Sequence, residues 1–355
     1  MKGDFPFQIK TINVSSDDQG QSKWQCPSNI AIVKYWGKHG WQLPRNASIS
    51  LTLSNAHTTT EVHYTYSDGL QIDFKFEGKE NKPFAEKIEK FLNSVMEYFP
   101  WLDNVALNIS SENSFPHSSG IASSASAMSA LSMCILDIER QLTGENIDIQ
   151  KASFLSRIGS GSASRSVISE IGMWGKHPSI ERSSDLYAIG LDDIHPVFKN
   201  FHDDILIVSE SEKSVSSTAG HGLMDGNVYA QARYDQANQR VKELISILKT
   251  GDVDAFGKLA EDEAMTLHAL MMCSDPSYIL MKPATISIIE EIRTYRERTG
   301  APIFFTLDAG PNIHLLYPDS TVEQAHDLIE NHLKQFTINS KIIKDYVGKG
   351  PKNMA

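Results

Sequence analysis

The alternation of apolar and polar positions predicts a strand-rich first half of the chain. In the segment LPRNASISLTL, Ile49, Leu51 and Leu53 alternate with serine and threonine, which indicates a half-buried strand. Further strands are predicted at residues 24–38, 58–66, 70–76 and 105–110. Apolar positions spaced by three and four predict an amphipathic helix at residues 85–99. Helices that follow a run of strands favour an α+β fold over a regular alternation.

A second set of elements begins near Asn200. Strands are predicted at residues 205–209, 301–308, 313–317 and 340–347, and helices at residues 224–248, 253–272, 285–298 and 322–335. A strand, helices, two strands, a helix and a strand, in this order, suit a ferredoxin-like domain. The tail GKGPKNMA is expected to be a solvated end.

The chain length supports this division into two parts. A chain of 355 residues exceeds one typical domain, and its hydrophobic content of 41% suits a sizeable core. The segment at residues 190–200 is rich in Asp, Pro, Gly and His and is the expected boundary. We therefore predict one domain at residues 1–198 and a second at residues 199–355.

Charge and cysteine usage limit the classes of partner. A net charge of −11 argues against general nucleic-acid binding, although a locally basic pocket can still take an anionic substrate. The three cysteines are far apart and form no CxxC pair, which argues against structural zinc or disulfides and fits a reducing compartment. The first twenty residues lack a signal-peptide core, and no apolar run has the length of a membrane span. We expect a cytoplasmic protein with no membrane partner.

The stretch FPHSSGIASSASAMSALSMCIL, residues 115–136, is the centre of the functional argument. Gly120 permits a tight backbone turn, and the small residues that follow carry apolar positions at helical spacing. The first turn of a helix has free N–H groups and a positive dipole end, so a phosphate can bind where no bulky side chain intervenes. The alternative is a small-residue helix packed closely on a neighbour. The Gly-Lys-Ser/Thr ending of a Walker loop is absent.

Three other segments carry candidate chemistry. In GSGSASRS, Arg165 offers a planar fork that matches a carboxylate or phosphate; the alternative is a surface ion pair. Lys34 and Lys38 flank an aromatic pair in an apolar strand, where an ammonium either meets an anion or extends to water. Asp308 ends an apolar strand at a glycine turn. It acts either as a general base that faces a pocket or as an ordinary turn residue.

Taken in order, the segments PSNIAIVKYWGK, LPRNASISLTL, FPHSSGIASSAS, GSGSASRS and FTLDAGPN resemble the diphosphomevalonate decarboxylases of the GHMP kinase superfamily. The resemblance implies a ribosomal protein S5 domain 2-like N-terminal domain, a ferredoxin-like C-terminal domain and an active site in the cleft between them. It implies ATP-dependent decarboxylation of mevalonate 5-diphosphate to isopentenyl diphosphate, with Mg²⁺ accompanying ATP and with a homodimer as the assembly.

The resemblance also implies roles for individual residues. Asp308 would act on the carbon 3 hydroxyl, Arg165 would hold the substrate carboxylate, and Lys34 would keep Asp308 ionised. The substrate diphosphate would contact Tyr35, Lys38, Ser160 and Ser162. The nucleotide phosphates would contact the segment 116–124, with Pro116, Ser118, Ser119, Gly120, Ser123 and Ser124. The metal ligands and the residues around adenine are not identified.

Two departures from the family pattern concern substrate fit. His221 stands where family members usually carry methionine, and the segment after SASRS has one glycine instead of a Gly-Gly pair. Two other functions stay open: a small-molecule kinase that phosphorylates mevalonate or a mevalonate phosphate without decarboxylation, and a non-catalytic module that binds nucleotide or diphosphate.

Overall fold

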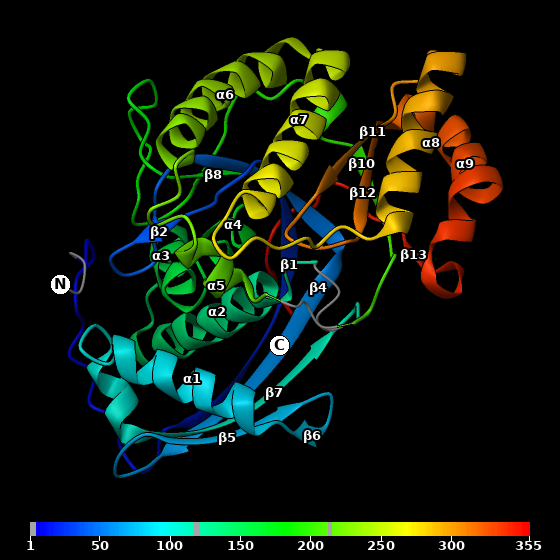
Figure 1. Cartoon of the computed structure of the whole chain (residues 1–355). Helices are drawn as coiled ribbons and strands as arrows, with labels where there is room; N and C mark the ends of the chain where they lie inside the picture. The colour runs from blue at the N-terminus through cyan, green and yellow to red at the C-terminus, as the bar shows by residue number, and fades with distance from the viewer. Residues whose placement is uncertain (1–4, 117–120, 212–214) are drawn as a thin grey trace.

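The computed structural model describes residues 5–116, 121–211 and 215–355 (Figure 1). Its large sheet has the strand order β14-β1-β4-β7-β5-β6, with β8 paired to β4 and β9 paired to β8. These strands are β1 (Gln19–Val33), β4 (Ser48–Tyr66), β5 (Gln71–Phe76), β6 (Lys79–Glu80), β7 (Val105–Asn113), β8 (Ile171–Trp174), β9 (Ile189–Gly190) and β14 (Lys352–Asn353). The pair β5 and β7 is parallel, and β1 and β4 are antiparallel. A separate small hairpin joins β2 (Lys38–His39) to β3 (Leu43–Pro44).

The helices of the first half lie against this sheet (Figure 1). They are α1 (Lys82–Val95), α2 (Ser123–Thr143), α3 (Ile149–Gly159) and α4 (Ala163–Ser166), with a short 3₁₀ turn at Pro100–Asn104. The predicted helix at 85–99 corresponds to α1, and its apolar face is buried as the spacing indicated. On α2 the small residues let the helix approach the sheet, since the Ser126 hydroxyl lies 2.7 Å from that of Thr58. Close packing therefore explains the later turns of this helix.

The second sheet has the order β11-β12-β10-β13. Its strands are β10 (Phe201–Leu206), β11 (Phe304–Leu307), β12 (Ile313–Pro318) and β13 (Ile342–Ile343), and every pairing is antiparallel. The helices are α5 (Ser217–Gly222), α6 (Ala230–Thr250), α7 (Val253–Met272), α8 (Pro283–Thr299) and α9 (Val322–Leu328). Short helical turns follow at Ile329–Leu333, Lys334–Phe336 and Ile338–Ser340, with further 3₁₀ turns at Pro196–Phe198 and Asp319–Thr321. This order of elements confirms the predicted ferredoxin-like arrangement.

One hydrophobic core joins the two sheets. It unites Ile32 and Ile49 of the first sheet with Phe256 of α7 and Phe304 of β11. On the other face of the small sheet, α8 and α9 cover a separate core (Figure 1). Burying apolar surface between the two halves fixes the end of β1 against α7 and the end of β11. This contact brings Lys34 and Asp308 to one place.

One local prediction was wrong and a second was incomplete, and both differences have a tertiary cause. The strands expected at 48–53 and 58–66 are one strand, β4, and residues 48–53 are buried on both faces. The polar face is covered by the segment after α4, where the Thr52 hydroxyl donates to the Ile168 carbonyl. Most of the tail is exposed, as expected, but it is also ordered, because Lys352 and Asn353 form β14, which pairs with β1. The predicted division at 198/199 falls between the 3₁₀ turn Pro196–Phe198 and β10, and it stays a prediction.

Candidate active site

A cavity of about 470 Å³ lies where the ends of β1 and β11 meet the first turn of α2 and the segment from α3 to α4. Its lining includes these predicted site residues: Lys34, Tyr35, Lys38, Ser123, Ser124, Ser160, Ser162, Arg165 and Asp308. Pro116 is half-buried and is not part of this lining. Ser118, Ser119 and Gly120 lie outside the described residues. Segments as far apart in the chain as Lys34 and Asp308 thus form one polar site.

The start of α2 presents backbone donors to this cavity. Ala122, the residue before the helix, has the left-handed conformation φ 47°, ψ 40°, and no side chain of the described residues caps the helix start. A left-handed non-glycine residue costs about 1–2 kcal/mol, and such strain is concentrated at functional sites. The Ser124 hydroxyl lies 3.3 Å from that of Ser160, so the predicted nucleotide and substrate groups adjoin. The uncapped turn fits an anion in the cavity.

Arg165 is a buried residue of this site, with an exposed fraction of 2%, so it is no surface ion pair. Its Nε donates to Asn29 Oδ1 at 3.3 Å and its Nη1 donates to Ser48 Oγ at 2.7 Å. Its Nη2 has no hydrogen-bond partner among the described residues, while the residue lines the cavity. Burial lowers the pKa of Arg165 to about 10, although Tyr35 and Asp308 oppose the shift, so the guanidinium stays charged at neutral pH.

Lys34 follows β1 directly and does not extend to water, since 1% of it is exposed. Its ammonium donates to the Ala31 carbonyl. Burial lowers the pKa of Lys34 to about 8, and the attraction of Asp308 and Glu263 limits the shift. Lys34 therefore remains mainly charged at neutral pH beside an acidic partner.

A buried ion cluster that the sequence did not reveal holds the backbone of Lys34. Its N–H donates to Glu263 Oε2 at 2.7 Å, and its carbonyl accepts from Arg233 Nη2 at 3.2 Å. Arg233 and Arg240 both pair with Glu263. Although burial acts in the opposite direction, these two arginines lower the pKa of Glu263. No sequence signal marks the cluster, because its members come from α6, α7 and the end of β1.

Asp308 follows the last residue of β11 and lies half-buried in the cavity wall. Its carbonyl accepts from the Gly310 N–H at 2.8 Å and lies 3.2 Å from His268 Nε2, which fixes the turn. Its charge opposes the lowering of the pKa of both Lys34 and Arg165. The three residues predicted to be catalytic are thus electrostatically linked in one cavity.

Comparison with known proteins agrees with this geometry. A family model for the diphosphomevalonate decarboxylase-like N-terminal domain matches residues 26–186, and one for the mevalonate 5-diphosphate decarboxylase C-terminal domain matches residues 204–353. The diphosphomevalonate decarboxylase of Debaryomyces hansenii is 32% identical over 317 residues, which cover 82% of this chain and 78% of that protein. The chain belongs to the diphosphomevalonate decarboxylase family.

Solved structures of this family share the fold. The mevalonate diphosphate decarboxylase of Staphylococcus aureus is 28% identical with a TM-score of 0.83, covering 96% of this chain and 99% of that one. The Enterococcus faecalis structure that concerns ATP binding mediated by mevalonate diphosphate is 25% identical with a TM-score of 0.81, covering 95% and 99%. A further structure, of MDDEF in complex with MVAPP, AMPPCP and magnesium, is 26% identical with a TM-score of 0.81 and the same coverage. The two-domain α+β fold of the GHMP kinase type is therefore confirmed.

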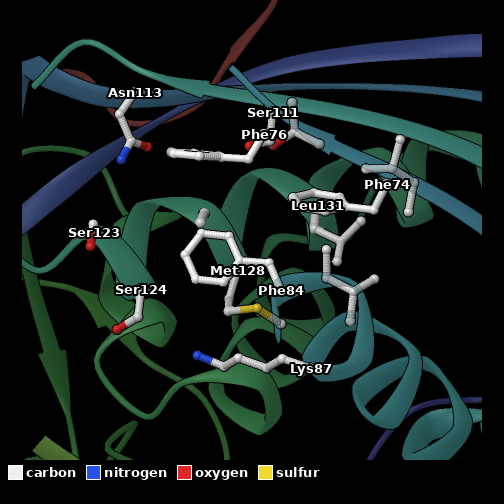
Figure 2. Close-up of a pocket in the computed structure, with 14 residues that line it drawn as sticks. Phe74, Phe76, Phe84, Lys87, Ser111, Asn113, Ser123, Ser124, Met128 and Leu131 are labelled. Atoms are coloured by element: carbon white, nitrogen blue, oxygen red, sulfur yellow. The ribbon is translucent and has the colours of Figure 1, made fainter. Parts of the chain in front are cut away.

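A second pocket adjoins the first. The sequence pattern of this chain did not indicate it. It is an apolar slot of about 100 Å³ between β4, β5, β7, α1 and α2, lined mainly by Phe74, Phe76, Phe84, Ile88, Ile109, Met128 and Leu131. Polar groups of Thr60, Ser111 and Asn113 lie along its β4 and β7 side. Figure 2 shows the Ser123 and Ser124 hydroxyls and the Lys87 ammonium toward one end of the slot and Phe74 toward the other. These two serines, Phe84 and Lys87 line both cavities.

The described residues contain no preformed metal cage and no membrane span. Nowhere in residues 5–116, 121–211 and 215–355 do three or more His, Cys, Asp or Glu side chains gather to hold a metal ion. Within the same ranges, every helix is too short or too polar to cross a membrane. His221, which stands where family members usually carry methionine, lies on α5 in the wall of the larger cavity.

Proposed function

We propose that this chain catalyses the ATP-dependent decarboxylation of (R)-5-diphosphomevalonate to isopentenyl diphosphate, ADP, phosphate and CO₂. Its family membership and the complex of its structural relative with MVAPP, AMPPCP and magnesium support the proposal. The observation that carries it is the meeting of Asp308, Lys34 and Arg165 in one cavity. Breaking the carbon–carbon bond to the carboxylate requires that this group be held in a fixed orientation, and the buried Arg165 fork in the same cavity can hold it.

The chemistry assigns one task to each of these residues. The Asp308 carboxylate accepts the proton of the carbon 3 hydroxyl as its oxygen bonds to the γ-phosphorus and the bond from this phosphorus to the bridging oxygen breaks. Lys34 keeps Asp308 ionised at neutral pH. Arg165 holds the carboxylate, whose carbon–carbon bond then breaks: its electron pair forms the new double bond, phosphate leaves carbon 3, and CO₂ is released.

The two adjoining cavities suggest how ATP binds. The apolar slot suits a planar base, with Ser111 and Asn113 as hydrogen-bonding partners at its edge. The serines shared with the larger cavity are the first residues of α2, where backbone donors favour phosphate. A nucleotide that spans both cavities would direct its γ-phosphate toward the cavity that contains Asp308. Mg²⁺ commonly binds through phosphates and one or two carboxylates, so it would accompany ATP and neutralise phosphate charge.

The substrate diphosphate has a separate place in this arrangement. Tyr35, Lys38, Ser160 and Ser162 line the cavity beside Arg165. Burial lowers the pKa of Lys38, and the neighbouring Lys87 ammonium lowers it further. Two ammonium groups that repel each other across a cavity favour a polyanion between them. We assign the diphosphate to this group, and a homodimer and a cytoplasmic location stay predictions from the sequence.

The test compares mevalonate, its 5-phosphate and its 5-diphosphate in a coupled assay of ADP release, with CO₂ and phosphate measured in parallel. We expect turnover of the diphosphate with equal amounts of ADP, phosphate and CO₂. ADP release without CO₂ would show a kinase, and binding without ADP release would show a non-catalytic module.

A further inference from the structure

The imidazole of His221 is held in the wall of the larger cavity by a precise set of contacts. It lies 4.3 Å from the ring of Tyr35 and 4.4 Å from that of Trp36, measured between ring centroids. The Gly37 N–H donates to its Nδ1 at 2.9 Å. The side chain is 8% exposed, and that remainder faces the cavity, because His221 is one of its lining residues. The ring therefore has a fixed orientation before any ligand arrives.

The contact with Gly37 determines which nitrogen carries the proton. A backbone N–H is always a donor, so Nδ1 must accept and cannot be protonated. The proton of the neutral ring is then on Nε2. Burial, assisted by the charge of Lys38 and opposed by that of Asp308, lowers the pKa of His221 to about 3, so the ring is neutral over the working range of an enzyme. No described residue accepts a hydrogen bond from Nε2. Nε2 is also not fully buried, since it does not belong to the fully buried polar atoms without a hydrogen-bond partner.

The neighbours of His221 indicate which ligand atoms it meets. The ring of Tyr35 packs against it at a tilt of 35°, and Lys38 is the charged group with the strongest effect on its pKa, ahead of Asp308. Tyr35 and Lys38 belong to the group that we assign to the diphosphate. A neutral N–H donor beside an ammonium suits a phosphate oxygen, which accepts strong charge-assisted hydrogen bonds. The thioether of methionine, the residue expected from the resemblance, has no such proton.

We propose that His221 is a substrate-contacting residue that donates a hydrogen bond from Nε2 to an oxygen of the substrate diphosphate. The assignment to a diphosphate rests on the proposed function. The hydrogen bond itself does not, because inorganic diphosphate offers the same oxygens. A hydrogen bond to a charged group is worth roughly a tenfold to hundredfold change in affinity.

Two substitutions separate this hydrogen bond from the structural contact with Gly37. His221→Asn places an amide oxygen near the position of Nδ1, so it can accept from Gly37 but has no donor in the cavity. His221→Gln extends its amide nitrogen toward the position of Nε2 and keeps a donor there. His177→Asn is the matched control, since His177 is also buried, its Nδ1 accepts from the Ser179 N–H, and it lies outside both cavities.

Calorimetry with inorganic diphosphate and with mevalonate 5-diphosphate measures the effect in the full chain. We expect His221→Asn to bind both probes tenfold to hundredfold more weakly, with ATP affinity and melting temperature close to wild type. His221→Gln should recover most of the affinity, and His177→Asn should bind like wild type. Equal binding by wild type and His221→Asn would overturn the proposal. So would an equal loss in the Asn and Gln variants, because the packing of the ring between Tyr35 and Trp36 would then be the cause.

A measurement on the unmodified protein covers the case in which the variants do not fold. In ¹⁵N-histidine spectra the His221 signals should show a neutral ring protonated at Nε2, and inorganic diphosphate should shift the Nε2–H resonance. A spectrum that does not respond to saturating diphosphate would refute the contact. If the wild type binds inorganic diphosphate through His221 but releases no CO₂ from mevalonate 5-diphosphate, the proposed function fails and this inference stands.

Discussion

Replacing Arg165 by lysine tests the site most directly, because the change keeps the charge and removes the fork. The guanidinium occupies two of its donors with Asn29 and Ser48, and Nη2 lacks a partner among the described residues. Lysine has one nitrogen, which cannot hold the protein acceptors and a carboxylate in the same planar arrangement. The substrate would lose at least one of two charge-assisted hydrogen bonds.

The expected magnitude follows from this count of contacts. One hydrogen bond to a charged group is worth about 1.5–3 kcal/mol, so kcat/KM should fall roughly tenfold to 150-fold. The protein itself should also lose stability, because Asn29 Oδ1 loses its buried donor, at a cost of about 1–3 kcal/mol. The loss of activity must therefore be separated from the loss of stability.

Arg157→Lys provides the control. Arg157 is 0% exposed, and burial lowers its pKa to about 10, as it does for Arg165. Its guanidinium donates to the carbonyls of Leu186 and Trp41. Unlike Arg165, it does not line the cavity. The two variants should lose comparable stability in thermal melts. Only Arg165→Lys should lose kcat/KM for mevalonate 5-diphosphate, while KM for ATP changes little.

A ligand without the carboxylate completes the assay. 3-Hydroxy-3-methylbutyl diphosphate is the substrate with this group replaced by hydrogen, and calorimetry should find equal affinity for it in the wild type and in Arg165→Lys. If Arg165→Lys weakens the binding of this analogue by the same factor as the binding of the substrate, Arg165 does not recognise the carboxylate. A lysine variant with wild-type turnover would refute the assignment altogether.

Three further predictions concern the rest of the site. Asp308→Asn keeps the shape of the turn but removes the base. The value of kcat should therefore fall by roughly 10² to 10⁴, with KM and melting temperature nearly unchanged. Normal turnover would make Asp308 an ordinary turn residue. Ser124→Leu places a bulky side chain at an exposed position on the first turn of α2. Calorimetry should show weakened ATP binding in a folded protein. Unchanged ATP binding would contradict the phosphate site. Lys34, with its pKa lowered to about 8 by burial, is charged at neutral pH beside Asp308, so Lys34→Met should raise the pKa of Asp308 and move the acid side of the kcat profile to higher pH. An acid side at the wild-type position in Lys34→Met would mean that the charge of Lys34 has no role.

The sequence by itself determined the type and order of most elements and the residues that carry the chemistry. Residues 253–272 form a helix with the predicted bounds, because its apolar spacing and its capping Asp252 are local signals. The segments with Lys34, Arg165 and Asp308 were recognisable because each combines a charged residue with an apolar or glycine-rich surrounding that requires a reason.

The tertiary structure alone decided what surrounds these residues. Residues 48–53 alternate like a half-exposed strand, yet both faces are buried, because the segment after α4 covers the polar face. The cluster around Glu263 and the apolar slot beside α2 draw their members from distant elements, so no spacing along the chain reveals them. Periodicity reports which face of an element is apolar, whereas burial, pKa and cavity shape depend on which other elements pack against it.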